Sequence, residues 1–283
     1  MSEAAFFTTG GRFTSIKREL LLHLLATAGL STVHVAYDTT MHPRDVQQLR
    51  GSVHKARGKS VRLLPLSFDR LEQKLGSNKL AGFAGGRNNR NPSVLGFFDA
   101  CARSPHEYCW RLEDDVVVSN FSSLADEWRT NQSDLVCQPR FKLPFWYRRW
   151  EEAKKLGRAS VFDSFVTDPR HGLPDGTMNM VNTALFRTSR VFARSLLATI
   201  RNEVNTSHHE IFLPFALRKR NLSWAALRES ARLQTSSHNP VRHLMGVCGF
   251  LRKARKEHTL YAHPIKRADC RPGERVIVHF THA

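Results

Sequence analysis

The first forty residues alternate between short apolar runs and a helical repeat of apolar positions. Residues 4–9 form one run, which stops at Gly10-Gly11, and residues 32–38 form the next. Between the two runs, leucines recur at helical spacing after Thr14 and Ser15, and either residue can cap the N-terminus of a helix. This β–turn–α–β pattern predicts two parallel strands joined by a helix.

The same alternation of apolar runs and helical repeats continues along the chain. It predicts further strands over residues 61–68, 108–112, 134–139, 180–186 and 276–280, and helices over 43–59, 92–103, 123–129, 189–200 and 240–257. The stretch 69–92 is polar and rich in glycine, which predicts a long loop. No repeat or linker interrupts the pattern, so we expect one α/β domain with a mixed, mostly parallel sheet flanked by helices.

Three consecutive carboxylates, Glu113, Asp114 and Asp115, stand between two apolar runs. Carboxylates that lose water repel one another, so such a cluster needs cations or hydrogen-bond donors. At the carboxyl end of a strand it suits a hard divalent metal, which takes oxygen ligands. The alternative interpretation is an acidic turn that only joins two strands.

Two other stretches have a composition that suits binding or catalysis. Residues 141–150 interleave aromatic side chains with arginines, which can stack on bases or sugars, or can simply pack with a cationic rim. Glu210 directly precedes an apolar Ile-Phe-Leu run. It is either an acid at the mouth of a buried site or a first-turn helix residue that the helix dipole favours.

The charge balance indicates attraction to anionic partners. Within 283 residues, 43 Lys and Arg oppose 25 Asp and Glu, which gives a formal net charge of +18. Nucleic acid, phosphorylated metabolites, acidic glycans and anionic lipid headgroups all fit this excess. The charge alone does not choose among them.

The compartment is left open by conflicting signals. No run of eighteen apolar residues and no signal-peptide pattern occurs in the sequence, so we expect a soluble chain. The odd number of cysteines, five, favours a reducing compartment, which would be the cytoplasm. Four Asn-x-Ser/Thr sequons, at Asn120, Asn131, Asn205 and Asn221, instead fit the Golgi or secretory lumen if an N-terminal anchor is missing.

The β–α–β start and a strand that ends in Glu113-Asp114-Asp115 resemble the GT-A class of nucleotide-sugar glycosyltransferases. In that class an acidic DxD motif follows a strand in the middle of a Rossmann-like sheet. Its acids hold a divalent metal, usually manganese or magnesium, against the diphosphate of the donor. The resemblance covers about residues 4–267 and rests most on the acidic triplet.

The resemblance implies a single GT-A domain over residues 1–283. Its nucleotide-binding part would cover about residues 1–120, and its acceptor and catalytic part about 121–283. The implied reaction moves a sugar from a UDP- or GDP-sugar to a hydroxyl of a glycan, protein or lipid. The basic charge suggests an acidic acceptor.

The resemblance also assigns roles to single residues. Asp115 would be the direct metal ligand, joined by His263, and Glu113 would face the donor ribose or metal-bound water, although Glu replaces the usual Asp there. Glu210 would be the catalytic base of an inverting transfer. With Glu113, the donor-binding candidates are Thr8, Asp38, Asp114, Gly176 and Lys266.

A rival interpretation is a basic nucleic-acid-binding protein or a metal-dependent nuclease. It explains the net charge of +18 and the arginine-rich aromatic stretch directly. Against it, the sequence contains no helix-turn-helix, zinc-finger or RNP pattern, and a nuclease usually needs more acids converging on two metals.

Overall fold

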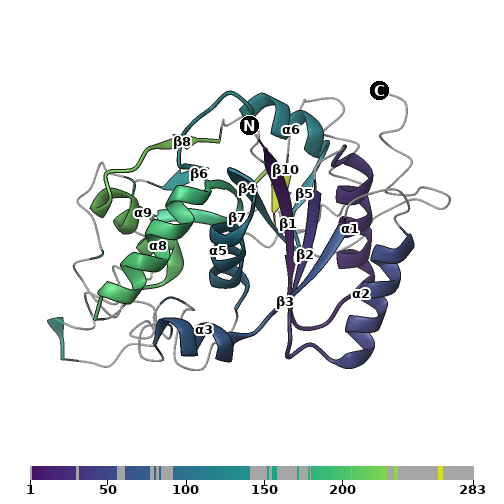
Figure 1. Ribbon diagram of the computed structural model, residues 1–283, viewed down its shortest axis with the longest axis horizontal. Coiled ribbons are helices and arrows are strands. Elements are labelled where there is room, and N and C mark those ends of the chain that lie inside the picture. The colour runs from purple at the N-terminus through teal and green to yellow at the C-terminus, as the bar shows by residue number, and fades with distance from the viewer. Residues whose placement is uncertain are drawn as a thin grey trace. The chain divides into compact units, whose positions relative to one another are not determined.

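The computed structural model contains a seven-stranded, mostly parallel sheet flanked by helices, in the strand order β3-β2-β1-β4-β7-β6-β8 (Figure 1). The predicted α/β class is therefore confirmed. A smaller sheet of three short strands has the order β5-β10-β9. The structure describes residues 2–29, 32–55, 61–76, 80, 83, 92–140, 152, 155–157, 171, 178, 180–204, 206–227, 233–234 and 261–263.

The elements follow one another as the sequence pattern predicts over most of the described chain. In the amino-terminal half they are β1 (Glu3–Thr9), α1 (Ser15–Thr27), β2 (Thr32–Asp38), α2 (Pro43–Lys55), β3 (Val61–Leu66), α3 (Phe68–Leu75), α5 (Ser93–Arg103), β4 (Tyr108–Glu113), β5 (Val117–Val118) and α6 (Phe121–Trp128). After these come β6 (Leu135–Arg140), β7 (Met180–Ser189), α8 (Arg190–Asn202), α9 (His209–Lys219), β8 (Trp224–Ala226), β9 (Leu233–Gln234) and β10 (Tyr261–His263).

The chain divides into two compact units. The first comprises Met1–Pro65, Trp110–Gln132 and Arg228–Ala283. The second comprises Leu66–Cys109 and Ser133–Leu227. Within the described residues, no helix has the length and apolar character needed to cross a membrane.

The first unit starts with the predicted β–α–β motif. β1 and β2 pair in parallel from Ala4 opposite Thr32 to Thr9 opposite Tyr37. Five consecutive residues of β2 and six of β1 are buried, as is typical of strands covered on both faces. The Thr14 side chain caps α1 by accepting a hydrogen bond from the Lys17 amide, which confirms the predicted helix start.

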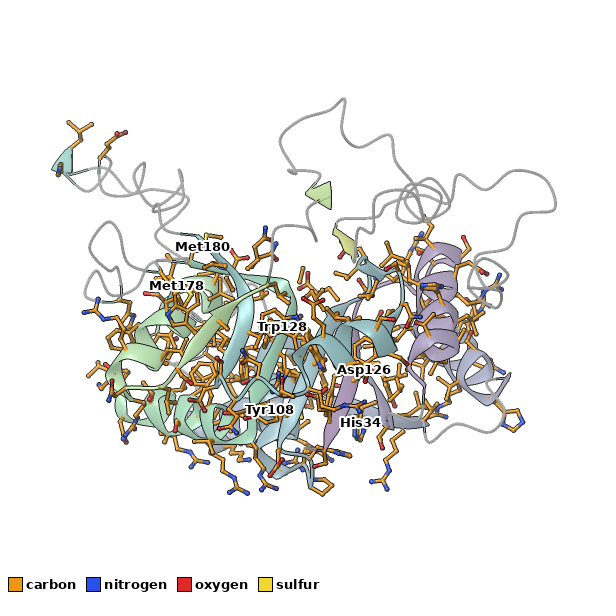
Figure 2. All side chains as sticks on the ribbon, turned by 90° about the horizontal axis from the view of Figure 1, so that it is seen from above. His34, Tyr108, Asp126, Trp128, Met178 and Met180 are labelled. Atoms are coloured by element: carbon orange, nitrogen blue, oxygen red, sulfur yellow. The ribbon has the colours of Figure 1, made fainter. Side chains whose placement is uncertain are left out.

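Helix α6 also belongs to the first unit and has one buried and one exposed side. Trp128 is 7% exposed, whereas Asp126 projects into solvent; both are labelled in Figure 2. The helix begins earlier than the predicted residue 123, because the Asn120 side chain accepts a hydrogen bond from the Ser123 amide. The cap is therefore an asparagine that the sequence pattern did not single out.

The second unit is built around aromatic side chains between α5, β7 and α8. Phe98 stacks on Phe186 and meets Phe192 edge-on, with ring centroids 5.6 and 5.9 Å apart. All three rings are 0% exposed. The helix predicted over residues 189–200 is confirmed as α8, and Ser189 Oγ caps it by accepting a 2.9 Å hydrogen bond from the Phe192 amide.

One helix of the second unit contradicts the sequence prediction. Residues 68–75 form α3, where we predicted the start of a polar loop. Phe68, Leu71 and Leu75 are buried at helical spacing, and the Ser67 side chain caps the helix by accepting from the Arg70 amide. The charged residues between the three apolar positions concealed this amphipathic repeat. The predicted helix 240–257 and strand 276–280 lie outside the described residues.

Two glycines in helical surroundings predict opposite responses to alanine. Gly29 follows α1 with φ +58°, and an added Cβ would lie 2.6 Å from Ser122 Oγ. Gly51 lies within α2, and an added Cβ there meets nothing within 4 Å. We expect G29A to lower the free energy of unfolding by about 1–2 kcal/mol and G51A to raise it by about 0.5–1 kcal/mol. Urea denaturation curves of the two variants measure this, and a G29A protein as stable as the wild type contradicts it.

Candidate functional site

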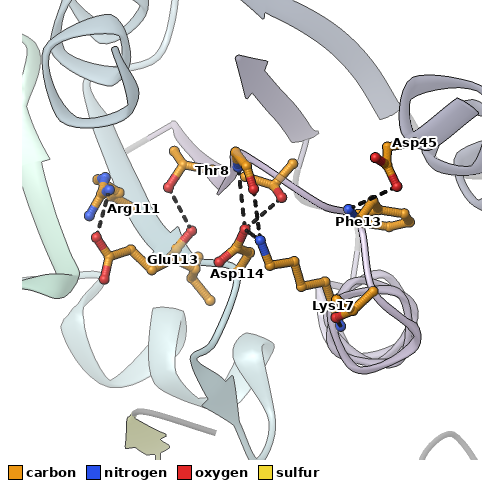
Figure 3. Close-up of polar contacts among 11 residues, drawn as sticks. Thr8, Phe13, Lys17, Asp45, Arg111, Glu113 and Asp114 are labelled. Atoms are coloured by element: carbon orange, nitrogen blue, oxygen red, sulfur yellow. Dashed lines mark hydrogen bonds and ion pairs between the residues drawn. The ribbon is translucent and has the colours of Figure 1, made fainter. Parts of the chain in front are cut away.

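The acidic triplet stands at the carboxyl end of β4, beside the carboxyl end of the neighbouring strand β1. Figure 3 shows two of its acids, Glu113 and Asp114. Thr8 Oγ1 at the end of β1 donates a 3.2 Å hydrogen bond to the Leu112 carbonyl at the end of β4. β2 and β3 follow β1 on one side, whereas β4 lies on its other side, so the strand order reverses here. In open α/β sheets, ligands bind at the carboxyl ends of the strands at such a reversal.

The triplet itself forms a tight turn between two strands. The Val116 amide donates a 3.1 Å hydrogen bond to the Glu113 carbonyl, which closes the turn between β4 and β5. The three acids are half-buried, whereas residues 116–118 that follow are buried. The turn expected under the alternative interpretation is therefore present, and it stands at a position where α/β sheets bind ligands.

Asp114 fastens the acidic turn to the loop between β1 and α1. Its Oδ2 atom accepts hydrogen bonds from Thr9 Oγ1 at 2.6 Å and from the Gly10 amide at 3.3 Å. The Lys17 ammonium lies 2.6 Å from the same oxygen and donates to the Gly10 carbonyl at 2.8 Å. Figure 3 shows these contacts converging on Asp114. The middle acid is therefore bound to the protein's own donors.

Glu113 is held by a buried arginine on its own strand. Arg111 Nη2 lies 3.0 Å from Glu113 Oε1, and because the two residues are two apart on β4, their side chains share one face (Figure 3). The Arg111 side chain is 0% exposed and that of Glu113 is 32% exposed. The guanidinium is thus buried behind a carboxylate that reaches solvent.

Asp115 ends the turn, and the backbone of β10 runs beside the strand that follows it. Tyr261 pairs with Val118 and Ala262 with Val117 in antiparallel register. Continuing this register by one residue sets the backbone of His263 opposite that of Val116. Among the described side chains, no three His, Cys, Asp or Glu residues form a group that could hold a metal ion.

Of the other donor-binding candidates, Asp38 lies within the described residues, whereas Gly176 and Lys266 do not. Asp38 Oδ1 accepts from the amide and the hydroxyl of Thr40, at 2.8 and 2.9 Å, so it stabilises the turn after β2. Its Cβ lies 3.8 Å from the position of a Cβ added to Gly10, which sets Asp38 beside the β1–α1 loop. Gly176, Lys266 and the stretch 141–150 lie outside the described residues, as does the side chain of His263.

Glu210 belongs to the second unit, in the first turn of α9. Its Oε2 atom lies 3.9 Å from Nδ1 of His208, and the Glu210 side chain is 22% exposed. The start of this helix is tied to Phe83, whose amide donates to Thr206 Oγ1 and whose carbonyl accepts from His209 Nδ1, both at 3.0 Å. A carbonyl only accepts, so Nδ1 of His209 carries a hydrogen.

The three cysteines of the described residues are poorly suited to act as nucleophiles. Cys101, Cys109 and Cys137 are buried and not disulfide-bonded. Burial raises the pKa of the Cys101 thiol and that of the Cys137 thiol well above their ordinary value. Thiols with raised pKa values are poor nucleophiles.

Three polar residues of the site escaped the sequence reasoning. Thr9, Lys17 and Arg111 contact the acids at 2.6–3.0 Å, yet none was a candidate. For Arg111 a signal was present, because a charged residue within the apolar run 108–112 requires a buried counter-charge. Lys17 and Thr9 contact Asp114, which is about a hundred residues away in sequence, and no local sequence pattern predicts such a contact.

Comparison with known proteins identifies the fold. No protein-family model matches the sequence, and no curated protein sequence is significantly similar to it. Among solved structures, mouse xyloside xylosyltransferase 1 in its apo form is similar with a TM-score of 0.53 and 11% identity, over 84% of this chain and 89% of that one. An active-site mutant of LgtC is similar with a TM-score of 0.50, and the galactosyltransferase LgtC in complex with donor and acceptor sugar analogues with a TM-score of 0.49. Both are 11% identical to this chain, over 98% of this chain and 92% of the other. The chain thus has the fold of GT-A glycosyltransferases.

Replacing each of the two β1 threonines by the isosteric valine compares the contributions of two hydrogen bonds to stability, that of Thr9 to Asp114 and that of Thr8 to the Leu112 carbonyl. Both threonines are 2% exposed, but Thr9 donates to a carboxylate and Thr8 to a carbonyl. We expect T9V to cost about 1.5–3 kcal/mol of unfolding free energy and T8V about 0.5–1.5 kcal/mol, because hydrogen bonds to charged groups are stronger. Chemical denaturation measures both, and a T8V cost equal to or larger than that of T9V contradicts the assigned role of Asp114.

Proposed function

We propose that this protein is a metal-dependent glycosyltransferase that moves a sugar from a UDP- or GDP-sugar to an acceptor hydroxyl. The observation that carries the proposal is the acidic turn Glu113–Asp115 at the reversal of strand order between β1 and β4. The fold shared with known glycosyltransferases supports the same reaction class. The basic charge of +18 favours anionic ligands, which include the diphosphate of the donor and an acidic glycan, protein or lipid acceptor.

The donor set at the turn fits a hard divalent cation such as Mn²⁺ or Mg²⁺. Glu113 and Asp115 supply carboxylate oxygens on either side of Asp114, which is already engaged by Lys17 and Thr9. Asp115 would hold the metal together with His263, whose strand runs beside β5. When bound, the metal would supply Lewis-acid stabilisation of the negative charge on the leaving diphosphate.

The residues around the turn would bind the rest of the donor. Thr8 and Asp38 stand at the carboxyl ends of β1 and β2, where a nucleoside would approach the sheet. Glu113 would face the ribose or metal-bound water, with its carboxylate oriented by Arg111. Asp114 would contribute by fixing the loop against which the nucleotide would lie. Gly176 and Lys266 would contact the sugar and the diphosphate.

Glu210 is the proposed general base, which would remove the proton of the acceptor hydroxyl as the new bond forms. Its place in the first turn of α9 leaves the carboxylate partly exposed, and the nearby His208 ring can orient it. Direct attack by the acceptor inverts the configuration at the sugar carbon, so an inverting reaction is part of the proposal.

A nucleic-acid-binding protein or a nuclease is the second candidate, and the net charge of +18 is the observation that favours it. The two candidates differ in their ligands. A glycosyltransferase binds a nucleoside diphosphate with metal, whereas a nucleic-acid protein binds random oligonucleotides tightly and loses them steeply as salt rises.

Ligand-induced stabilisation tests the metal–nucleotide site. We expect UDP or GDP with Mn²⁺ to raise the melting temperature, since a ligand at a hundredfold excess over Kd stabilises the folded state by about 2.7 kcal/mol. D115N should abolish the shift. D126N, at an exposed aspartate of α6 in the same unit, should keep it. Absence of any shift across common nucleoside diphosphates, together with salt-sensitive oligonucleotide binding, favours the second candidate.

Turnover tests the proposed base. E210Q should reduce sugar release or transfer by about 10²–10⁴-fold, the usual contribution of a general base, while donor affinity changes little. E127Q, at an exposed glutamate of α6, is the matched control and should turn over normally. A near-normal rate for E210Q would remove Glu210 from the mechanism without affecting the donor site.

A further inference from the structure

We propose that Lys17 is a positioning residue, which holds the acidic turn in the conformation that binds metal and donor. The inference rests on the proposed function, and it adds a residue that lies neither on the turn nor among the metal-ligand and donor candidates. Lys17 stands in the first turn of α1 and reaches the acidic turn across 97 positions of sequence.

The contacts of Lys17 connect the two segments that meet at the site. Its ammonium donates to the Gly10 carbonyl at 2.8 Å and lies 2.6 Å from Asp114 Oδ2. Gly10 in turn donates its amide to the same carboxylate oxygen. Lys17, Gly10 and Asp114 therefore form a closed set of interactions that joins the β1–α1 loop to the acidic turn (Figure 3).

The ion pair is shielded from solvent, unlike the neighbouring pair on the same helix. The side chains of Lys17 and Asp114 are 20% and 18% exposed. Those of Arg18 and Glu19 are 53% and 26% exposed, and their closest atoms are 3.2 Å apart. Partial burial strengthens a charge interaction, whereas exposed pairs contribute little.

Lys17 itself stands on a fixed support. The Thr14 side chain caps its helix through the Lys17 amide, and the Phe13 amide donates to Asp45 Oδ1 of α2 at 3.2 Å (Figure 3). Phe13 is 4% exposed, so the segment that leads into α1 is packed as well as hydrogen-bonded. The helix start that carries Lys17 is thus held by hydrogen bonds and by packing.

The Lys17–Asp114 contact would affect metal and donor binding because of where Asp114 lies in the turn. Asp114 is covalently between Glu113 and Asp115, in a turn of four residues closed by the Val116 amide. Each residue has only two soft backbone dihedrals, so fixing the middle side chain restricts both neighbours. Loss of Lys17 would therefore loosen the two carboxylates proposed to bind ligand.

Charge and positioning predict opposite results for removal of Lys17, which makes the inference testable. The three acids with Lys17 and Arg111 have a net charge of −1. Without Lys17 the net charge becomes −2, and by charge alone a divalent cation would bind more tightly. If Lys17 acts by positioning, the cation binds more weakly despite the added negative charge.

The experiment measures Mn²⁺ affinity by electron paramagnetic resonance, and UDP affinity with saturating Mn²⁺ by calorimetry. We expect K17M to weaken both by about 10–100-fold, the range found when residues that orient metal ligands are lost. K17R, which keeps a cation at this position, should recover part of the loss. GDP replaces UDP if it is the nucleotide that stabilises the wild type.

Two control variants separate this effect from general ones. R18M removes a neighbouring exposed cation of α1 and should leave both affinities within about twofold, as exposed charges interact weakly. K74M breaks an ion pair with Asp99 in the second unit, and it should lower the melting temperature without changing either affinity. A loss of affinity in K74M equal to that in K17M would reduce Lys17 to a purely structural role.

The outcomes distinguish the inference from the function on which it rests. If the wild type binds Mn²⁺ and nucleotide and K17M binds them equally well or better, the inference is wrong and the proposed function stands. If the wild type binds neither, both are wrong. If K17M does not fold, K17Q decides, because it also removes the ammonium that contacts Asp114 but keeps a polar side chain. Affinities in K17Q equal to or higher than those of the wild type then overturn the inference.

Discussion

The site depends on one oxygen atom, Oδ2 of Asp114. Three donors from the β1–α1 segment converge on it, and together they join two segments that are about a hundred residues apart in sequence. Three adjacent acids would otherwise repel one another and hold the turn open. Because Lys17 compensates the middle acid and Arg111 the first, the turn can stand half-buried beside the strand ends.

The different contacts of the three acids would let a single turn both stabilise the fold and bind the proposed ligand. Asp114 faces its own protein, while Glu113 keeps a third of its side chain exposed and Asp115 stands next to the strand that pairs with β10. A carboxylate engaged by internal donors is a poor ligand for a cation, and its neighbours benefit from being held in place. The structural and the ligand-binding interpretations of the triplet are therefore compatible.

Much of this fold could be predicted because its signals are local. The buried runs of β1 and β2 and the caps Thr14 and Ser189 follow from residue type and spacing, and the structure confirms them. Helix α3 was missed because charges interrupt its apolar positions. The acidic turn was predictable as a feature, whereas its partners were not, since Lys17 and Thr9 reach it only through the pairing of distant segments.

The central claim is that the turn Glu113–Asp115 binds a divalent metal with a nucleoside diphosphate. The most direct test is an anomalous difference map from crystals grown with MnCl₂ and UDP, or GDP if only GDP stabilises the protein. We predict a manganese peak within ligand distance of the Asp115 carboxylate, about 2.0–2.3 Å, with diphosphate oxygens on the same ion. A fully occupied nucleotide elsewhere, or no manganese at the turn in protein that turns over a nucleotide sugar, would contradict the claim.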